Sequence, residues 1–292
     1  MTPTVLVEGC AGLASLSLAV ACGRPTDAPW ARPGSKTGYA RALLRLAGLT
    51  RWRPERMVWC EPAEDCRMML RAYPDREALT EAARLCQDWG RRYPGPEGQR
   101  ELWMHLREQG PPGDHSAAEV ARVASVQART VNQAGVRAFG GVSLDDWTPQ
   151  LRTDGTRGYT DDAPADKLGA IAAGRWPQTE LHRDIRELDP IPGALLYLDP
   201  PYAGTLGYGE GDLTRAEVLA LCERWAAAGA LVLASEAVPL ADELGAGWHA
   251  IDIGSARQGR ARINGCVTEW VTMSREPAWQ PAVQAGLFGG RR

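Results

Sequence analysis

The residues whose types and spacing best suit catalysis stand together, directly after a short apolar run: Asp199, Pro200, Pro201 and Tyr202. The run, residues 194–198, is typical of a strand that is buried on both faces of a parallel sheet. Asp199 would then lie at the carboxyl end of that strand, where open α/β sheets bind their ligands. The prolines fix φ and present carbonyl groups without competing N–H donors. We expect a rigid row of hydrogen-bond acceptors beside an aromatic ring, which suits a planar group that carries an amino function.

A second candidate site lies near the N-terminus, where the sequence TVLVEGCAGLASL predicts a strand, a glycine-containing turn and a helix. The turn consists of Glu8, Gly9, Cys10, Ala11 and Gly12. It is similar to a dinucleotide-binding loop but lacks the full G-x-G-x-x-G pattern. Two interpretations therefore stay open, a cofactor loop and a turn that only joins the strand to the helix.

Two further acids extend this pattern. A second short buried strand, at 57–62, leads into Glu61, and an acid at this position can accept hydrogen bonds from both hydroxyls of a ribose. Asp184 precedes the strand at 194–198, where its carboxylate could reach an adenine amino group, although it could also be a solvated acid. An oxidoreductase would use the turn and Glu61, but it would leave the D-P-P-Y motif unexplained.

The bulk composition is that of an ordinary globular protein, with 44% hydrophobic and 24% charged residues in a chain of 292. The net charge of −3 gives no global attraction to nucleic acid, so such binding would depend on local patches. The seven cysteines show no metal-ligand spacing with the four histidines, so we expect free thiols in a reducing compartment and no metal. The sequence predicts a cytoplasmic protein without a membrane span.

The elements that would position these residues alternate between strand and helix, with one interruption. Strands are expected near 5–7, 57–62, 194–198 and 230–237, and two late strands near 248–254 and 266–274 form an antiparallel pair. Between about 75 and 164 the alternation is replaced by helical segments. The pattern predicts an α/β fold, a doubly wound sheet with a helical insertion after its second strand. The expected division is 1–74 and 165–275 for the two parts of the core, 75–164 for the insertion and 276–292 for a flexible tail.

Together these segments resemble a known family. The sequences VEGCAGLASLSL, VWCEP, LHRDIREL and LYLDPPY, with the long insertion, are similar to the Dam-like (D12 class) DNA N6-adenine methyltransferases. The likeness covers most of residues 1–275, and D-P-P-Y is its most specific element. It implies a Rossmann-like methyltransferase sheet in which residues 8–12 form the S-adenosylmethionine loop and Glu61 holds the ribose. It also implies that the insertion is the target-recognition region.

The chain departs from the family pattern in two places. Gly9 and Cys10 stand where the family usually has Pro-Phe, and the lysine segment that normally precedes the loop has its nearest equivalent after it, at Lys36. Lys36 is one of two lysines in the chain, against 31 arginines. Because lysine and arginine differ in geometry and hydration, this retention favours a cofactor or DNA contact.

The resemblance suggests how the D-P-P-Y residues act. The amino nitrogen of adenine is a poor nucleophile because its lone pair is delocalised into the ring. Acceptors on both of its N–H bonds would help it to pyramidalise and would offset the charge that develops on methyl attack. We expect Asp199, which also borders the cofactor, and the Pro200 carbonyl to supply them. Tyr202 would stack on an adenine flipped out of the duplex.

Residues that could contact double-stranded DNA fall in two basic segments. Residues 120–144 contain no acid, and their candidates are Arg122, Arg129, Asn132, Gln133 and Arg137. The segment between the two late strands carries Arg257, Arg260 and Arg262. Arginine suits phosphates or guanine, whereas asparagine and glutamine pair with adenine edges. Either segment could instead be a solvated face. The expected binding unit is a monomer.

The tail adds one more expected partner. Gln284, Leu287 and Phe288 resemble the Q-x-x-L-F peptides by which bacterial DNA enzymes dock on the replication sliding clamp. Such a peptide on a tether would raise the local concentration of the enzyme near DNA. Alternatively, the two apolar residues fold back onto the domain or have no role.

Two other functions remain open. The same fold could act on cytosine N4 or on an RNA base, although Asp199 favours adenine because cytosine-N4 enzymes more often carry Ser before Pro-Pro. A catalytically inactive DNA-binding relative is the other possibility. Glu61, Asp184 and Asp199 oppose it, whereas the departure at Gly9 and Cys10 keeps it open.

Overall fold

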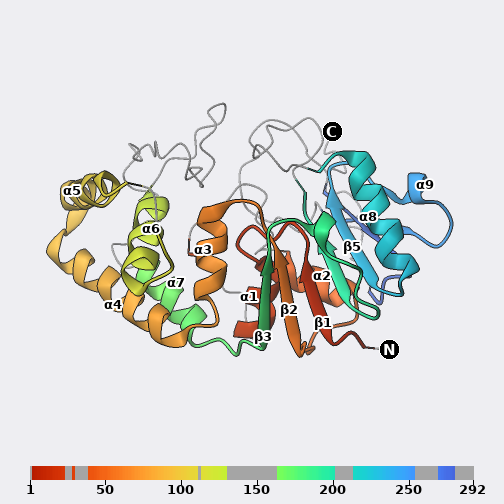
Figure 1. The fold of residues 1–292 in the computed structure, drawn as a ribbon, viewed down its shortest axis with the longest axis horizontal. Coiled ribbons are helices and arrows are strands. Elements are labelled where there is room, and N and C mark those ends of the chain that lie inside the picture. The colour runs from red at the N-terminus through yellow and green to blue at the C-terminus, as the bar shows by residue number, and fades with distance from the viewer. Residues whose placement is uncertain are drawn as a thin grey trace, which may run out of the picture.

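A twisted sheet organises the molecule (Figure 1). The computed structural model describes residues 2–23, 28–29, 39–110, 113–129, 163–200, 213–253 and 269–279. Within these residues seven strands lie in the order β3-β2-β1-β4-β5-β7-β6. Their bounds are Val5–Glu8 (β1), Arg56–Cys60 (β2), Gln178–His182 (β3), Leu195–Leu198 (β4), Leu231–Glu236 (β5), His249–Asp252 (β6) and Trp270–Met273 (β7).

The strand directions define the fold class. β1 to β5 are parallel, whereas β7 runs antiparallel to both β5 and β6. In the middle of the sheet, Val7 of β1 pairs with Val58 of β2 on one side and with Leu196 of β4 on the other. The chain adds β2 and β3 on one side of β1 and then β4 and β5 on the other side. The strand order therefore reverses at β1, which makes this position the topological switch point of the sheet. The predicted doubly wound, Rossmann-like α/β class is confirmed, and so is the antiparallel pair of late strands.

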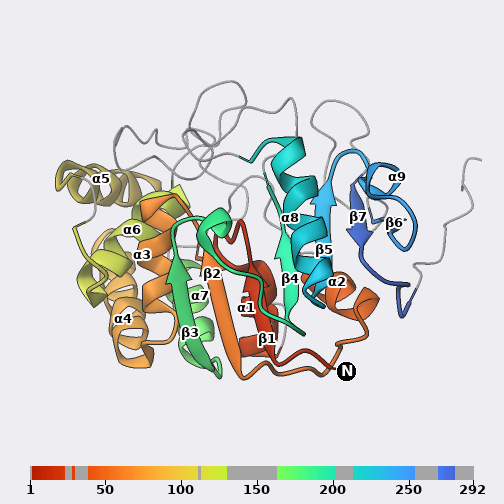
Figure 2. The same ribbon diagram turned by 45° about the vertical axis from the view of Figure 1, so that its right-hand side comes forward.

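Helices cover both faces of the sheet, with α8 on one face and α1 and α2 on the other (Figure 2). Alternate residues of each strand feed the two cores: Leu6 packs with the α1 and α2 side and Val7 with the α8 side. The helix bounds are Ser15–Cys22 (α1), Ala40–Leu46 (α2), Glu64–Ala72 (α3), Arg76–Arg92 (α4), Gly95–Glu108 (α5), Ala117–Arg129 (α6), Ala163–Ala172 (α7), Arg215–Ala227 (α8) and Ala241–Leu244 (α9), with the short 3₁₀ helix η2 at Ile185–Glu187.

Helices α4, α5 and α6 lie toward the β3 side of the molecule, away from β6 and β7, and α7 packs on the face of the sheet that α1 covers (Figures 1 and 2). They follow β2 in the chain, and α4 packs against α6 and α7. Asp75 begins α4 by accepting a hydrogen bond from the backbone N–H of Ala78. Residues 75–129 carry nine acids and eight arginines, so this group of helices has no net positive charge. The domain boundaries and the role of the insertion in DNA recognition stay predictions.

Three chemical properties of the described residues bear on function. Six of these residues are cysteines that carry a thiol group outside any disulfide: Cys10, Cys22, Cys60, Cys66, Cys86 and Cys222. Within the same residues no group of three or more His, Cys, Asp or Glu side chains is arranged to hold a metal ion. Among the helices in the described parts of the chain, none has the length and apolar character that a membrane span requires.

Candidate functional site

The loop after β1 is fixed to the carboxyl ends of both neighbouring strands. The backbone N–H of Gly9 donates to the carbonyl of Tyr197 in β4 at 2.8 Å, and that of Ala11 donates to the carbonyl of Cys60 in β2 at 3.0 Å. Gly12 and Ala14 both have positive φ, +52° and +53°, and Ala14 is the N-cap of α1. Left-handed backbone at a residue with a side chain is uncommon, and it persists where the surroundings hold it. The loop is therefore a constrained turn with α1 directly behind it.

Gly9 stands where no larger residue fits. A Cβ added to Gly9 would lie 2.4 Å from Cδ2 of Leu198 and 3.0 Å from Cγ1 of Ile185. The crowding comes from Leu198 of β4 and Ile185 of η2. Both residues belong to the hydrophobic core between the sheet and α8. The departure from the family pattern at this position is thus matched by the packing around it.

Glu8 is a buried acid that holds the start of α1. Its carboxylate accepts hydrogen bonds from the backbone N–H groups of Leu16 (3.1 Å) and Ser17 (2.9 Å) and from the Ser17 hydroxyl. Burial raises the pKa of Glu8 to about 7, against the lowering effect of these hydrogen bonds, and the nearby Asp199 adds to the rise. Glu8 therefore positions the loop through its hydrogen bonds to the start of α1. This is a supporting role, whereas the sequence predicts a direct contact with the cofactor.

Glu61 joins β2 to the loop. The side chain is buried, with 6% of its surface exposed. One carboxylate oxygen accepts a hydrogen bond from the backbone N–H of Gly12 at 2.7 Å, and the other accepts from the backbone N–H of Ala63 at 3.0 Å. Glu61 lies at the end of a strand next to the switch point, where the sequence predicts a ribose ligand. Its contact with Gly12 brings two predicted cofactor residues together.

Cys10 lies within electrostatic range of several of these acids. Its thiol pKa is well above the ordinary value because of burial, and next because of the negative charges of Glu61 and Asp199 and, more weakly, of Asp184. Carboxylates affect a pKa in this way only from short range. The thiol therefore stays protonated at neutral pH. Glu61, Asp199 and Asp184 therefore all act electrostatically on one residue of the loop.

Asp199 comes directly after β4, as the sequence predicts. It is half-buried, and the Pro200 that follows is buried. Its charge raises the pKa values of both Glu8 and Cys10, which places the carboxylate beside the loop. Pro201 and Tyr202, the remaining residues of the motif, lie outside the described residues, as does Lys36.

Asp184 is engaged by the chain itself. Its carboxylate accepts hydrogen bonds from the backbone N–H of Arg186 at 2.8 Å and from the Arg186 guanidinium, and so it begins η2. Burial acts to raise the pKa of Asp184, but the hydrogen bonds from Arg186 outweigh it and the pKa is lowered. Arg186 also forms an ion pair with Glu217 of α8. In this structure, an adenine amino group would have to share the carboxylate with Arg186.

Arg122 has a structural environment, which corrects its prediction as a DNA contact. Its residue surface is 2% exposed, and its guanidinium donates to the carbonyls of Leu106 (3.1 Å) and Gly110 (2.7 Å). It also pairs with the carboxylate of Glu119, one turn earlier on α6, at 2.6 Å. A guanidinium held in this way is not available to a phosphate. Arg122 instead ties α6 to the end of α5.

The other predicted DNA residues are not placed. Arg129 ends α6, but its side chain lies outside the described residues, together with Asn132, Gln133, Arg137, Arg257, Arg260 and Arg262. The clamp peptide, Gln284 to Phe288, lies outside them too. These assignments stay predictions.

Two aromatic residues that the sequence analysis missed support the loop from below. The indole N–H of Trp59 donates to the Ser17 hydroxyl at 2.8 Å, which extends the hydrogen-bond chain that starts at Glu8. The Tyr73 hydroxyl donates to the carbonyl of Leu13 at 3.1 Å. The rings of Trp59 and Tyr73 meet edge to face at 6.2 Å. Trp59 lies in a strand and Tyr73 at a helix end, and nothing in their spacing signals that both reach the loop.

Comparisons with known proteins add little to this geometry. No protein-family model matches the chain, and no curated protein sequence matches it. Among solved structures, the chain is similar to the rRNA methyltransferase aviRa from Streptomyces viridochromogenes, with 12% identity and a TM-score of 0.32. That match covers 95% of this chain and 77% of the other. A TM-score this low lends no weight to a shared activity, so the function rests on the site residues.

Proposed function

We propose that the protein is an S-adenosylmethionine-dependent methyltransferase that acts on the N6 amino group of a flipped adenine in double-stranded DNA. The observation that carries the proposal is the placement of Glu61 and Asp199 directly after β2 and β4, the strands on either side of β1 at the switch point, with Glu61 hydrogen-bonded to the loop at Gly12. Ligands of doubly wound sheets bind at this edge. The D-P-P-Y sequence that begins at Asp199 gives the proposal its reaction type.

The described residues fit the proposed cofactor in two respects. The sulfonium group carries a positive charge, and the acids Glu61, Asp184 and Asp199 surround the loop that would face it. The ribose hydroxyls are hydrogen-bond donors, and Glu61 offers carboxylate oxygens at the end of β2. S-adenosylmethionine, when bound, supplies an electrophilic methyl group.

In the proposed mechanism the chain positions the base and manages charge on its amino group. The Asp199 carboxylate and the Pro200 carbonyl each accept one amino N–H, so the nitrogen lone pair is released toward the methyl carbon. The nitrogen–carbon bond would form as the methyl–sulfur bond breaks, with its electron pair leaving on sulfur as a neutral thioether, and Asp199 would offset the positive charge that develops on the nitrogen. The amino group then loses one proton to solvent by way of Asp199. Tyr202 would hold the base by stacking.

The proposal includes partners that the sequence suggests. We expect double-stranded DNA to be contacted by the side chains of Arg129, Arg137 and the arginines between the late strands, and the protein to bind as a monomer. Docking of Gln284, Leu287 and Phe288 on a sliding clamp would raise the concentration of the enzyme near DNA. Clamp affinity of the intact protein and of a form truncated after Ala282 tests this part, and equal affinities would contradict it.

Identification of the methylated nucleoside tests the activity and its substrate. Purified protein is incubated with S-adenosylmethionine and either unmethylated duplex DNA or RNA, and the digested nucleosides are measured by mass spectrometry. The proposal predicts N6-methyladenine in DNA. If the product were N4-methylcytosine, or if only RNA were methylated, the assigned methyl acceptor would change while the proposed fold and mechanism would stay the same. Cofactor binding without any product would favour the inactive relative.

A further inference from the structure

A cavity lies at the opposite edge of the sheet from Asp199 and Glu61. It has a volume of about 260 Å³ and is lined by Val20, Arg53, Pro54, Met57, Arg175, Trp176 and Pro177. Arg53 and Pro54 precede β2, and Arg175 to Pro177 precede β3, so these residues stand at the amino ends of two parallel strands. Neither the proposed methyl transfer nor its DNA substrate uses this edge.

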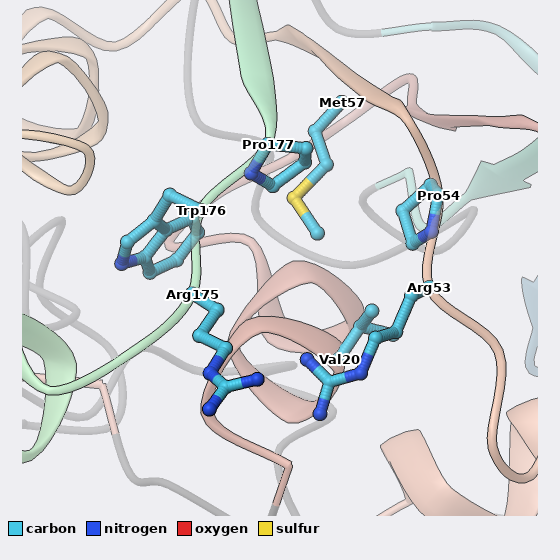
Figure 3. A pocket seen from close by; sticks show the side chains of 7 residues that line it. All are labelled: Val20, Arg53, Pro54, Met57, Arg175, Trp176 and Pro177. Carbon is cyan, nitrogen blue, oxygen red and sulfur yellow. The ribbon is translucent and has the colours of Figure 1, made fainter.

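Two arginines face this cavity together. Figure 3 shows the guanidinium groups of Arg53 and Arg175 on the same side of the cavity, beside Val20. Both residues are exposed, and no carboxylate among the described residues forms an ion pair with either. The nearest acid on β3, Glu180, pairs instead with Arg56 and His182. Two like charges over an apolar floor repel one another, and an anion between them would relieve that repulsion.

The backbone fixes the positions of both arginines. The N–H of Arg175 donates to the carbonyl of Ala21 at the end of α1, at 2.8 Å. On the other side, the Trp52 indole donates to the carbonyl of Pro3 at 2.6 Å, and the N–H of Glu55 donates to the carbonyl of Thr4 at 2.7 Å. Arg53 lies between these two anchors. The cavity mouth is therefore pre-organised, which lowers the entropic cost of binding.

Another wall of the cavity, at Trp176, is held equally firmly. Trp176 stacks on Tyr73 with ring centroids 5.1 Å apart, meets Trp59 edge to face at 6.0 Å, and donates its indole N–H to the carbonyl of Ile171 at 3.2 Å. Gly174 permits this arrangement, since a Cβ there would lie 2.9 Å from the Trp176 indole nitrogen. Together with the half-buried Pro177, which also lines the cavity, Trp176 offers apolar contact to a ring.

We propose that this cavity binds a small aromatic phosphate monoester, with the phosphate between Arg53 and Arg175 and the ring against Trp176 and Pro177. Guanidinium groups recognise phosphate through paired, charge-assisted hydrogen bonds, and two of them match its charge. The cavity is large enough for one aromatic ring, and it lies on the far side of the sheet from the acids that would repel an anion.

Calorimetric titration of the full chain with phenyl phosphate tests the proposal. We expect a dissociation constant on the order of 1 mM, and weaker binding of inorganic phosphate and of phenol, which each carry half of the recognised features. Arg53→Gln and Arg175→Gln should each weaken binding about three- to tenfold, and the double variant about tenfold or more, since exposed charge pairs are screened. Both side chains are exposed, so an unchanged unfolding midpoint is expected.

Two matched controls separate this site from the rest of the protein. Arg51→Gln removes an exposed arginine two residues from Arg53 that does not line the cavity, and it should leave binding unchanged. Asp199→Ala should also leave it unchanged while abolishing methyl transfer, so the two proposals can fail separately. The proposal is overturned if phenyl phosphate does not bind, if the double variant binds as well as the wild type, or if Arg51→Gln weakens binding equally. Preferential binding of a short oligonucleotide would overturn it too.

Discussion

The carboxylate of Glu61, at the end of β2, accepts a 2.7 Å hydrogen bond from the backbone N–H of Gly12 in the loop after β1. Gly12 has a positive φ, which glycine adopts without strain, and Glu61 is buried, so the contact fixes a tight turn to the rim of the sheet. The residue expected to hold the ribose of the cofactor therefore also holds the loop against which that cofactor would lie. Binding and loop order are coupled through one side chain.

Replacement of Glu61 should test that coupling. Glu61→Ala is expected to weaken S-adenosylmethionine binding by about 1.5–3 kcal/mol, the range for hydrogen bonds to a charged group. It should also lower the unfolding midpoint, because the Gly12 and Ala63 N–H groups lose their acceptor. Calorimetry and thermal unfolding measure the two effects. Glu55→Ala, an exposed acid just before β2, is the control. An unchanged cofactor affinity in Glu61→Ala would move the ribose site elsewhere.

Glu8 should make stability depend on pH in a defined direction. Its pKa is raised to about 7 in the folded protein, from 4.5 as the ordinary value. Between these pH values the folded state binds more protons than the unfolded state. The contribution of Glu8 to the free energy of unfolding is therefore complete below about pH 4.5 and is lost as the pH rises to about 7. The loss amounts to roughly 3 kcal/mol. Relative to Glu8→Gln, the wild type should lose that much unfolding free energy in denaturant titrations between pH 4.5 and 7. If the unfolding free energies of the two proteins changed with pH in the same way, this assignment would be contradicted.

Gly9→Ala should disturb the loop by steric overlap. The added methyl would meet Leu198 at 2.4 Å, so either the loop or β4 must move. We expect a loss of about 1–3 kcal/mol in unfolding free energy, the range for overpacked sites, together with weaker cofactor binding. Gly169→Ala in α7 is the matched control, because a Cβ there meets nothing within 4 Å and alanine favours the helix. Equal stability of the two variants would refute the packing argument.

Arg122→Ala should affect stability and leave the salt dependence of DNA binding unchanged. The change leaves the carbonyls of Leu106 and Gly110 without their donor and Glu119 without its partner. The expected cost is about 3 kcal/mol, at the lower end for a broken buried pair because Glu119 is partly exposed. Arg100→Ala, an exposed arginine on α5, is the control. If Arg122→Ala instead reduced the salt slope of DNA affinity at unchanged stability, Arg122 would be a phosphate contact after all.

The sheet could be predicted from the sequence because strand and helix periods are local properties. The buried run before Asp199 matches β4 closely, and α8 begins with a capping box at Thr214 and Glu217, a pattern that is local in the sequence. The gathering of Glu61 and Asp199 also follows from the sequence, since the carboxyl ends of parallel strands share one edge.

What could not be predicted depends on contacts between distant residues. Arg122 occurs in a stretch without acids, yet Glu119 lies just before that stretch, at the i−3 position where a helical partner is expected. That local signal could have been found, whereas the carbonyl acceptors from α5 could not. Trp59 and Tyr73 support the loop through tertiary packing, and no sequence period encodes which element an aromatic ring will reach.

The most direct test of the central claim is methyl transfer to DNA by the wild type and by Asp199→Ala, measured with labelled S-adenosylmethionine under saturating cofactor. Asp199 is half-buried at a strand end, so the variant should keep its fold and much of its cofactor affinity. The account predicts that the wild type forms N6-methyladenine and that the variant loses the rate by several orders of magnitude. A variant that methylates DNA at close to the wild-type rate would contradict it.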